Sequence, residues 1–219
     1  MINSPFYLRN SVHAPVRIYL ASSNPGKLAE FRALAESAAA DSSSSTTSLV
    51  EMLPRFNSLP PFEENAPTFG ENALGKVLYY SQLRDGIVFA DDSGLVVPAL
   101  DGAPGVHSAR YAGPDATSAD RINKLLGELA GRPRQERGAY FCCVIAVVRR
   151  GLPIAVISNR VDGEILESPH GAGGFGYDPV FSLPELHKTF AELAPPEKNL
   201  YSHRGKAFRR LLSLLNTSS

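Results

Sequence analysis

Two adjacent carboxylates, Asp91 and Asp92, stand between two apolar runs near the middle of this 219-residue chain. We expect the apolar residues 87–90 and 95–97 to be strands, with the two acids at the carboxyl end of the first strand and a Ser-Gly turn after them. Paired acids at the end of a buried strand are costly to fold unless a cation offsets their charge. Mg²⁺ takes oxygen ligands of this kind. A plain polar turn with side-chain-to-backbone hydrogen bonds is the alternative.

Residues 22–27, Ser-Ser-Asn-Pro-Gly-Lys, follow a strand expected at 16–21 and begin a helix. Asn-Pro suits the N-cap and first position of a helix. Free N–H groups, the helix dipole and Lys27 together favour a bound anion such as phosphate. The segment is not a Walker P-loop, which needs glycine at position 21 and serine or threonine at position 28, where this chain has Ala21 and Leu28. A capped helix with a solvated lysine is the alternative.

An acidic loop and the helix expected after it, at about 70–83, carry further polar groups. Glu64 lies in the loop and is a candidate second metal ligand beside the paired acids. We expect the helix to bury one face, formed by Leu74, Val77 and Leu78. Asn72 and Lys76, four residues apart, share a separate face, and a solvated surface pair is the alternative. Gly75 inside this helix costs about 1 kcal/mol relative to alanine.

Residues 170–179 form a glycine-rich loop that contains two aromatic rings. Three glycines within residues 173–176 allow the backbone to approach a ligand closely. Phe175 and Tyr177 can stack on a planar base, and Asp178 can accept hydrogen bonds from base or sugar donors. Aromatic core filling is the alternative, but it does not explain the surrounding glycines.

A basic helix start lies near the C-terminus, where Ser202 is the expected cap of the last helix. His203 and Arg204 lie in its first turn, and Lys198 comes just before it. Cations at a helix N-terminus oppose the helix dipole. We therefore expect these groups to bind an anion, with a solvated basic helix start as the alternative.

The composition excludes several classes of protein. The chain has 22 basic and 22 acidic residues, so its formal net charge of zero gives no bulk attraction to nucleic acid or to anionic membranes. No apolar run approaches the ~20 residues that span a bilayer, and residues 1–15 lack the apolar core of a signal peptide. Cys142 and Cys143 would point to opposite faces of a strand, so we expect reduced thiols. We predict a cytoplasmic protein without nucleic-acid or membrane partners.

Helices and strands interleave along the chain, which indicates an α/β fold with a mixed sheet. Beyond the segments above, we expect a strand within 49–57, a helix at 118–130, and strands at 139–149 and 153–161 that form a hairpin through Arg150 and Gly151. Residues 1–15 are an N-terminal extension, residues 16–216 form a single domain, and residues 41–48 form a serine-rich mobile loop within it.

In order and spacing, the segments resemble the inosine/xanthosine triphosphate pyrophosphatase family over about residues 18–215. Members of this family remove non-canonical purine nucleoside triphosphates from the nucleotide pool. The matching stretches are residues 22–27, 68–73, 90–95, 102–111, 173–181 and 202–205. The resemblance implies an elongated, two-lobed α/β fold with a long mixed β-sheet flanked by helices and a central nucleotide cleft. It also implies Mg²⁺ as the cofactor and a homodimer.

The resemblance implies roles for single residues. Asp92 matches the catalytic carboxylate, which binds Mg²⁺ and accepts a proton, and Glu64 matches the second carboxylate of the metal site. From the residues themselves we add Asp91 and Lys76 to the catalytic group. The expected substrate-binding residues are Ser22, Ser23, Asn24, Pro25, Gly26, Lys27, Asn72, Ser93, Phe175, Gly176, Tyr177, Asp178, Lys198, His203 and Arg204.

Together these features predict hydrolysis of ITP, dITP or XTP to the monophosphate and pyrophosphate. A water beside Asp92 or Asp91 attacks the α-phosphorus while the lysines and arginine neutralise the phosphates. Asp178 and His203, with backbone groups, read the 6-keto edge of the base. One alternative is a pyrophosphatase for modified pyrimidine nucleotides, but its first turn is rich in Ser and Arg and it lacks Phe-Gly-Tyr-Asp. Another is a nucleotide sensor without turnover, against which the intact acids argue.

Overall fold

The computed structural model describes residues 16–41 and 48–217, so the N-terminal extension and residues 42–47 of the serine-rich segment lie outside the described residues. In these ranges seven strands form one sheet in the order β2-β1-β3-β4-β5-β6-β7. The strands are β1 Val16–Leu20, β2 Ser48–Met52, β3 Ile87–Val96, β4 Gly138–Arg149, β5 Leu152–Ile165, β6 Phe181–Leu183 and β7 Lys188–Thr189. β1 is parallel to β2 and β3, and the other pairs are antiparallel. The expected mixed sheet is confirmed.

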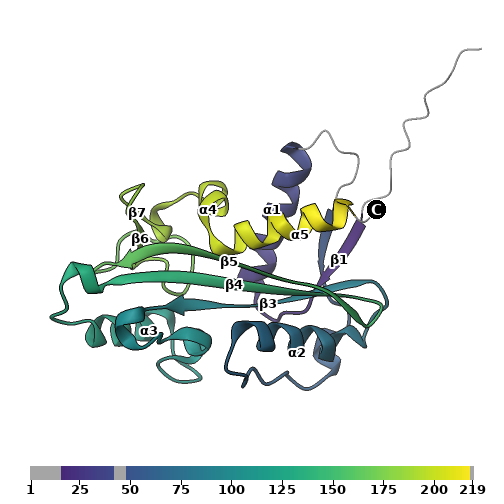
Figure 1. Ribbon diagram of the computed structural model, residues 1–219, viewed down its shortest axis with the longest axis horizontal. Coiled ribbons are helices and arrows are strands. Elements are labelled where there is room, and N and C mark those ends of the chain that lie inside the picture. Colours follow the sequence, from purple (N-terminus) through teal and green to yellow (C-terminus); the bar gives the residue numbers. More distant parts are fainter. Residues whose placement is uncertain (1–15, 42–47, 218–219) are drawn as a thin grey trace, which may run out of the picture.

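Helices flank both faces of this sheet. They are α1 Pro25–Asp41, α2 Phe69–Ser81, α3 Ser118–Glu128, α4 Pro195–Tyr201 and α5 His203–Thr217. Figure 1 shows an elongated molecule, with α1, α4 and α5 on one side of the long strands and α2 and α3 on the other. The short helix α4 was not expected from the sequence. In the described part of the chain, no helix is both long and apolar enough to cross a membrane.

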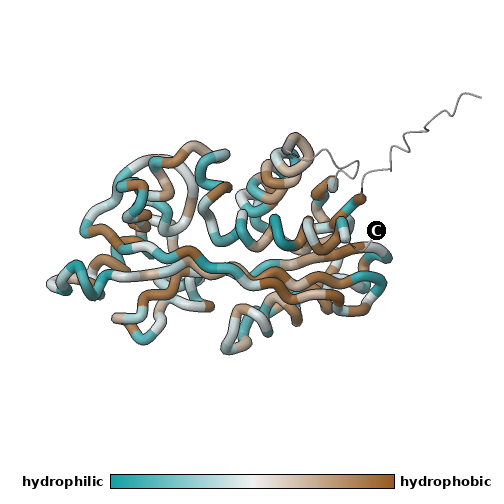
Figure 2. The backbone as a smooth tube through the Cα atoms, turned by 45° about the horizontal axis from the view of Figure 1, so that its top comes forward, coloured by the Kyte–Doolittle hydropathy of each residue, from teal (hydrophilic) through white to brown (hydrophobic). Residues whose placement is uncertain are grey.

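The central strands bury both faces, and their side chains alternate between two clusters. In β3, Val88 and Ala90 pack against α2, whereas Phe89 packs against α1 and α5. Figure 2 shows the hydrophobic residues running along these strands. In β4, Cys143 lies in the α5-side cluster and Cys142 packs against the α2-side cluster, so the two thiols are free and face opposite ways, as predicted.

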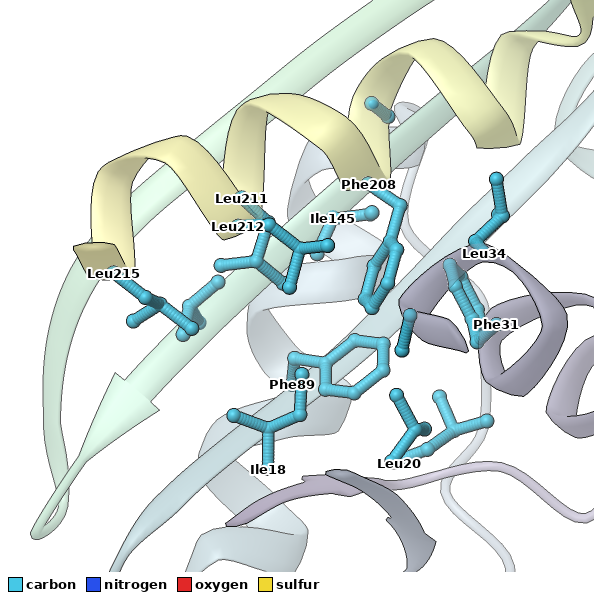
Figure 3. Close-up of a cluster of buried hydrophobic side chains, with 14 of the residues drawn as sticks. Ile18, Leu20, Phe31, Leu34, Phe89, Ile145, Phe208, Leu211, Leu212 and Leu215 are labelled. Atoms are coloured by element: carbon cyan, nitrogen blue, oxygen red, sulfur yellow. The ribbon is translucent and has the colours of Figure 1, made fainter. Parts of the chain in front are cut away.

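Three aromatic rings join α1 and α5 to the sheet (Figure 3). The Phe31 ring centroid is 5.1 Å from that of Phe89 and 5.0 Å from that of Phe208, and all three side chains are fully buried. The predicted inward residues of α5 are confirmed, namely Phe208, Leu211, Leu212 and Leu215. This cluster brings the basic starts of both helices together, since the Arg204 guanidinium lies 5.9 Å from the Phe31 ring.

The interpretation of residues 87–97 as two strands and a turn is wrong. β3 runs through the segment and pairs with β4 without interruption. Gly94 is required by a close approach, because a Cβ at this position would lie 2.4 Å from Ser108 Oγ. Asp91 and Asp92 therefore lie within a strand, where adjacent side chains point to opposite faces.

The expected core face of α2 is partly wrong. Val77 is buried, but the Leu78 side chain is 40% exposed. The buried face carries Asn72, Ala73, Lys76, Val77 and Tyr80. Asn72 and Lys76 are therefore not a solvated pair, because the helix turns these polar groups toward acids of the sheet and of the loop before it.

The β4–β5 hairpin is confirmed. Arg150 and Gly151 form its two-residue turn with φ angles of 50° and 78°. Turns of this kind match the twist of antiparallel strands. β5 is longer than expected and continues to Ile165, where it pairs with β6.

Replacing Phe208 with alanine should lower the free energy of unfolding by about 3–5 kcal/mol, because it removes a fully buried ring from between α1 and β3. Chemical denaturation measures this loss. Leu152→Ala is the control, since the Leu152 side chain is 70% exposed and its loss should cost less than about 0.5 kcal/mol. Equal effects of the two substitutions would contradict the central place of this cluster.

Candidate active site

Most of the residues singled out in the sequence line one cavity of about 460 Å³. The predicted site residues in its lining are Ser22, Ser23, Asn24, Lys27, Glu64, Lys76, Asp92, Ser93, Phe175, Gly176, Tyr177, Asp178, Lys198, His203 and Arg204. Pro25, Gly26, Asn72 and Asp91, which were also expected in the site, do not line it. The fold thus gathers segments from the whole chain around a single space.

Asp92 is the cavity acid that faces α2. Its side chain is buried, and Asn72 Nδ2 donates a hydrogen bond of 3.0 Å to Asp92 Oδ2. The Asn72 oxygen in turn accepts the N–H of Ala66 at 2.9 Å, which fixes the orientation of the amide. Burial and the nearby Glu64 carboxylate raise the pKa of Asp92 to about 6. This acid can therefore exchange a proton close to neutral pH.

Glu64 enters the same part of the cavity from the loop before α2. Its carboxylate pairs with Lys76, whose Nζ also donates to the backbone oxygen of Asp91 at 2.8 Å. Burial alone would lower the pKa of Lys76, but Glu64 and Asp91 outweigh it and raise the pKa. Arg110 Nη2 holds the backbone oxygen of Glu64 at 2.7 Å.

Glu64 and Asp92 suit a hard divalent cation. Mutual repulsion between these two carboxylates contributes to the raised pKa of Asp92, and a cation between them would relieve it. Among the described residues, no group of three or more His, Cys, Asp or Glu side chains could hold a metal. Mg²⁺ commonly binds through one or two carboxylates and fills its remaining positions with water and phosphate oxygens. A donor set of two acids therefore fits Mg²⁺ bound together with a phosphate ligand.

Asp91 faces the opposite side of the sheet and is fully buried. Its Oδ2 lies 2.9 Å from Lys27 Nζ and 3.7 Å from Arg204 Nε, and it accepts a hydrogen bond from Ser93 Oγ. Burial would raise the pKa of Asp91, but Lys27 and Arg204 more than offset it and hold the pKa well below its usual range. This placement favours a structural role for Asp91 and does not favour the catalytic role expected for it.

Glu30 of α1 is a central residue that the sequence analysis missed. Its carboxylate accepts Lys198 Nζ at 2.8 Å and also pairs with Arg204. Arg204 Nη2 in addition donates to Ser93 Oγ at 3.0 Å. Glu30 follows Lys27 by three residues, a spacing that puts both on one face of the helix and could have identified it.

The glycine-rich loop is fixed by Asp178. Asp178 Oδ2 accepts the N–H of Phe175 at 2.8 Å and Lys198 Nζ at 2.7 Å. Gly174 has φ 71°, and a Cβ there would lie 2.0 Å from Asp178 Oδ2, so glycine is required. The Asp178 carboxylate is thus already engaged within the protein, although it was expected to accept hydrogen bonds from a base or sugar.

The two rings of this loop differ in exposure. Phe175 is 38% exposed and lies on the cavity, with Lys198 Nζ 4.9 Å from its ring centroid. Tyr177 is buried, and its hydroxyl donates to the backbone oxygen of Ser108 at 3.0 Å. Phe175 is therefore the more exposed of the two rings, and the stacking role expected for Tyr177 is not favoured.

His203 is a buried, neutral group on the cavity wall. Its ring stacks on Phe141 at a centroid distance of 4.8 Å, and Nδ1 has no hydrogen-bond partner among the described residues. Burial, followed by the charges of Arg204 and Lys198, lowers the pKa of His203 well below its usual value. A neutral imidazole has one donor and one acceptor nitrogen, which suits reading a base.

The start of α1 is capped as predicted, but its backbone donors are used. Asn24 Oδ1 accepts the N–H groups of Gly26 and Lys27 at 2.9 and 3.2 Å. The free N–H groups expected there are therefore not available to an anion, and the Lys27 side chain remains. Arg110, within the stretch 102–111, also lines the cavity, although no role was predicted for it.

Comparison with known proteins places the sequence and the fold of this chain in one class. The structure of a HAM1 protein from Coxiella burnetii is 40% identical with a TM-score of 0.78, covering 93% of this chain and all of that one. The Ham1 protein of Staphylococcus aureus has 35% identity and the same TM-score, with the same coverage. A dITP/XTP pyrophosphatase of Geobacillus kaustophilus is 50% identical over 89% of this chain and 91% of its own length. The Ham1 family profile matches residues 18–214, and the chain belongs to the Ham1 family.

Asp91→Asn should destabilise the protein by about 3–5 kcal/mol, because it leaves Lys27 without its carboxylate partner and removes one of the two carboxylates that pair with the buried Arg204. Urea denaturation at neutral pH measures the change. Glu51→Gln is the matched control, since Glu51 pairs with Arg17 on the surface at 3.6 Å and such pairs contribute about 0–1 kcal/mol. An Asp91→Asn variant as stable as the wild type would contradict the structural role of Asp91.

Proposed function

We propose that this chain is a Mg²⁺-dependent nucleoside triphosphate pyrophosphatase for non-canonical purine nucleotides, yielding the monophosphate and pyrophosphate from ITP, dITP or XTP. The observation that carries the proposal is that the carboxylates of Asp92 and Glu64 line the same cavity as Lys27, Lys198 and Arg204. The same cavity therefore contains carboxylates that can bind a cation and Lys and Arg side chains that can bind phosphates. The dITP/XTP pyrophosphatases among the relatives support this substrate class.

Asp92 accepts the proton of the attacking water in this mechanism, and Asn72 holds the carboxylate in place. Its raised pKa brings it close to the pH at which a base works best. Mg²⁺ held by Glu64 and Asp92 would supply charge neutralisation for the triphosphate and a more acidic water. Lys27, Lys198 and Arg204 bind phosphate oxygens and stabilise the charge that develops as pyrophosphate leaves.

The base lies at the Phe175 side of the cavity in this proposal. The exposed Phe175 ring stacks on it, and the neutral His203 reads the 6-keto edge. A 6-amino purine presents a donor where the 6-keto group presents an acceptor, and a mispaired buried polar group can discriminate strongly. Asp178 contributes indirectly, because it fixes the loop that carries Phe175.

A substrate panel tests the proposal. With Mg²⁺ present, pyrophosphate release should be fast for ITP, dITP and XTP and slow for ATP and modified pyrimidine triphosphates. Excess chelator should abolish release and added Mg²⁺ should restore it. Nucleotide binding without turnover would support a sensor instead, and undiminished turnover in chelator would exclude the metal mechanism.

Asp92→Asn should lower kcat by at least about 10²-fold with the fold retained, because it removes the proton acceptor and one metal ligand while keeping the shape. Steady-state kinetics with ITP and circular dichroism measure the two effects. Asp91→Asn, compared at a temperature where it is folded, should keep far more activity. A near-normal kcat in Asp92→Asn would show that another group accepts the proton of the attacking water.

The pH profile gives an independent check. Asp92 must be ionised to accept a proton, and its pKa is raised to about 6, so kcat/KM should fall as the pH is lowered through about 6. The Asn72 hydrogen bond favours the ionised form, and Asn72→Ala should therefore move this fall to higher pH. The measurement uses subsaturating ITP and Mg²⁺, and a flat profile from pH 5 to 8 would contradict the assignment.

The substitutions His203→Ala and Phe175→Leu should have different effects on nucleotide preference. His203→Ala removes the group that contacts the 6-keto edge, so it should reduce the preference for ITP over ATP. Phe175→Leu removes the stacking ring, so it should lower kcat/KM for both nucleotides together. Each loss should correspond to about 1–3 kcal/mol. The measurement is kcat/KM for both nucleotides in both variants. Equal losses for ITP and ATP in His203→Ala would make His203 a phosphate ligand.

Three further assignments belong to this proposal. We propose a homodimer, a cytoplasmic location and a single two-lobed domain over residues 16–216, as the resemblance and the composition imply. Sedimentation velocity at micromolar concentration tests the first, and a monomer there would contradict it. Limited proteolysis tests the last, since one domain should yield no stable internal fragment.

A further inference from the structure

Gly75 lies in the interior of α2, where glycine is unfavourable relative to alanine. Its backbone is helical, so it does not need the conformational freedom of glycine. A Cβ at this position would lie 2.7 Å from Cζ of Phe62. The absent side chain thus leaves a recess on α2, which we call the Gly75 notch, and the tip of the Phe62 ring occupies it.

Phe62 belongs to residues 60–68, which we call the Glu64 loop. Several hydrogen bonds fasten this loop to α2 on both sides of Glu64. The Phe62 N–H donates to the Tyr80 hydroxyl at 3.1 Å, and the Ala66 N–H donates to Asn72 Oδ1 at 2.9 Å. In addition to these hydrogen bonds, the Phe62 ring in the Gly75 notch makes an apolar contact between the loop and α2.

Glu64 lies between these anchors, and its carboxylate reaches Lys76, the residue after Gly75. The distance between the Glu64 carboxylate and Asp92 therefore depends on how closely the loop lies against α2. Mg²⁺ demands near-ideal octahedral geometry, so small displacements of one acid weaken its binding. Residues that orient metal ligands commonly affect metal affinity in this way.

We propose that Phe62 and Gly75 are positioning residues that set the depth at which Glu64 enters the cavity, and through it the affinity for Mg²⁺. The consequence for Mg²⁺ rests on the proposed function, whereas the anchoring of the loop does not. A methyl group at position 75 would push the Phe62 ring out of the notch and carry the loop with it. Shortening Phe62 would make room for that methyl group.

The first test is amide hydrogen exchange in the metal-free protein. Gly75→Ala should speed exchange of the Phe62 and Ala66 amides, and the double variant Phe62→Leu/Gly75→Ala should restore slower exchange. Gly127→Ala is the matched control. Gly127 is also a helical glycine, but a Cβ there would meet nothing within 4 Å.

The second test is the Mg²⁺ requirement. In Gly75→Ala, the Mg²⁺ concentration for half-maximal ITP turnover should rise about tenfold, with kcat at saturating Mg²⁺ nearly unchanged. The Mg²⁺-induced increase in Tm should weaken in parallel. The Tm of the metal-free variant should change little, since alanine favours the helix while the displaced Phe62 ring loses packing. A merely structural role would leave the Mg²⁺ requirement unchanged.

Gly75→Ala that behaves like Gly127→Ala in both tests would overturn the proposal. The proposal would also be overturned if the effects of the two substitutions in Phe62→Leu/Gly75→Ala added instead of cancelling. A wild-type protein without Mg²⁺-dependent turnover would contradict the proposed function instead. The exchange comparison would then decide the positioning role by itself.

Discussion

The cavity depends on carboxylates that pair with buried cations. Lys198 and Arg204 are almost fully buried, and a buried cation is strongly destabilising unless an anion and hydrogen bonds offset the loss of water. Glu30 pairs with both, and Asp91 adds a second carboxylate for Arg204. Because the acids belong to α1 and β3 and the cations to α4 and α5, these pairs can form only when all four elements have packed together.

This pairing determines how the cavity can receive a phosphate chain. Lys27, Lys198 and Arg204 are each engaged by a protein carboxylate in this structure. An anionic ligand must therefore share these donors with Asp91, Glu30 and Asp178. A free triphosphate would also meet the carboxylates of Glu64 and Asp92, which repel it. Under the proposed function, metal and nucleotide would therefore enter together, since each reduces the electrostatic cost of binding the other.

Local features could be predicted from the sequence, and contacts between distant residues could not. The Asn24 cap, the Ser202 cap and the Arg150-Gly151 turn depend on neighbouring residues and were predicted correctly. Gly94 looked like a turn residue because nothing nearby in the sequence shows that Ser108 packs on it. Leu78 looked buried for a related reason, since the hydrophobic pattern does not show that α2 turns polar side chains toward the acids.

Asp91 and Asp92 show why the site itself could not be assigned from sequence alone. They are the same residue type in adjacent positions, and strand alternation places them in opposite surroundings. On the α5 side two cations lower the pKa of Asp91 and keep it charged, whereas on the α2 side burial and Glu64 raise the pKa of Asp92 to about 6. Environments that separate two acids in this way give them different roles. Asp91 can then hold Lys27 and Arg204 in place at any working pH, and Asp92 is left free to exchange a proton.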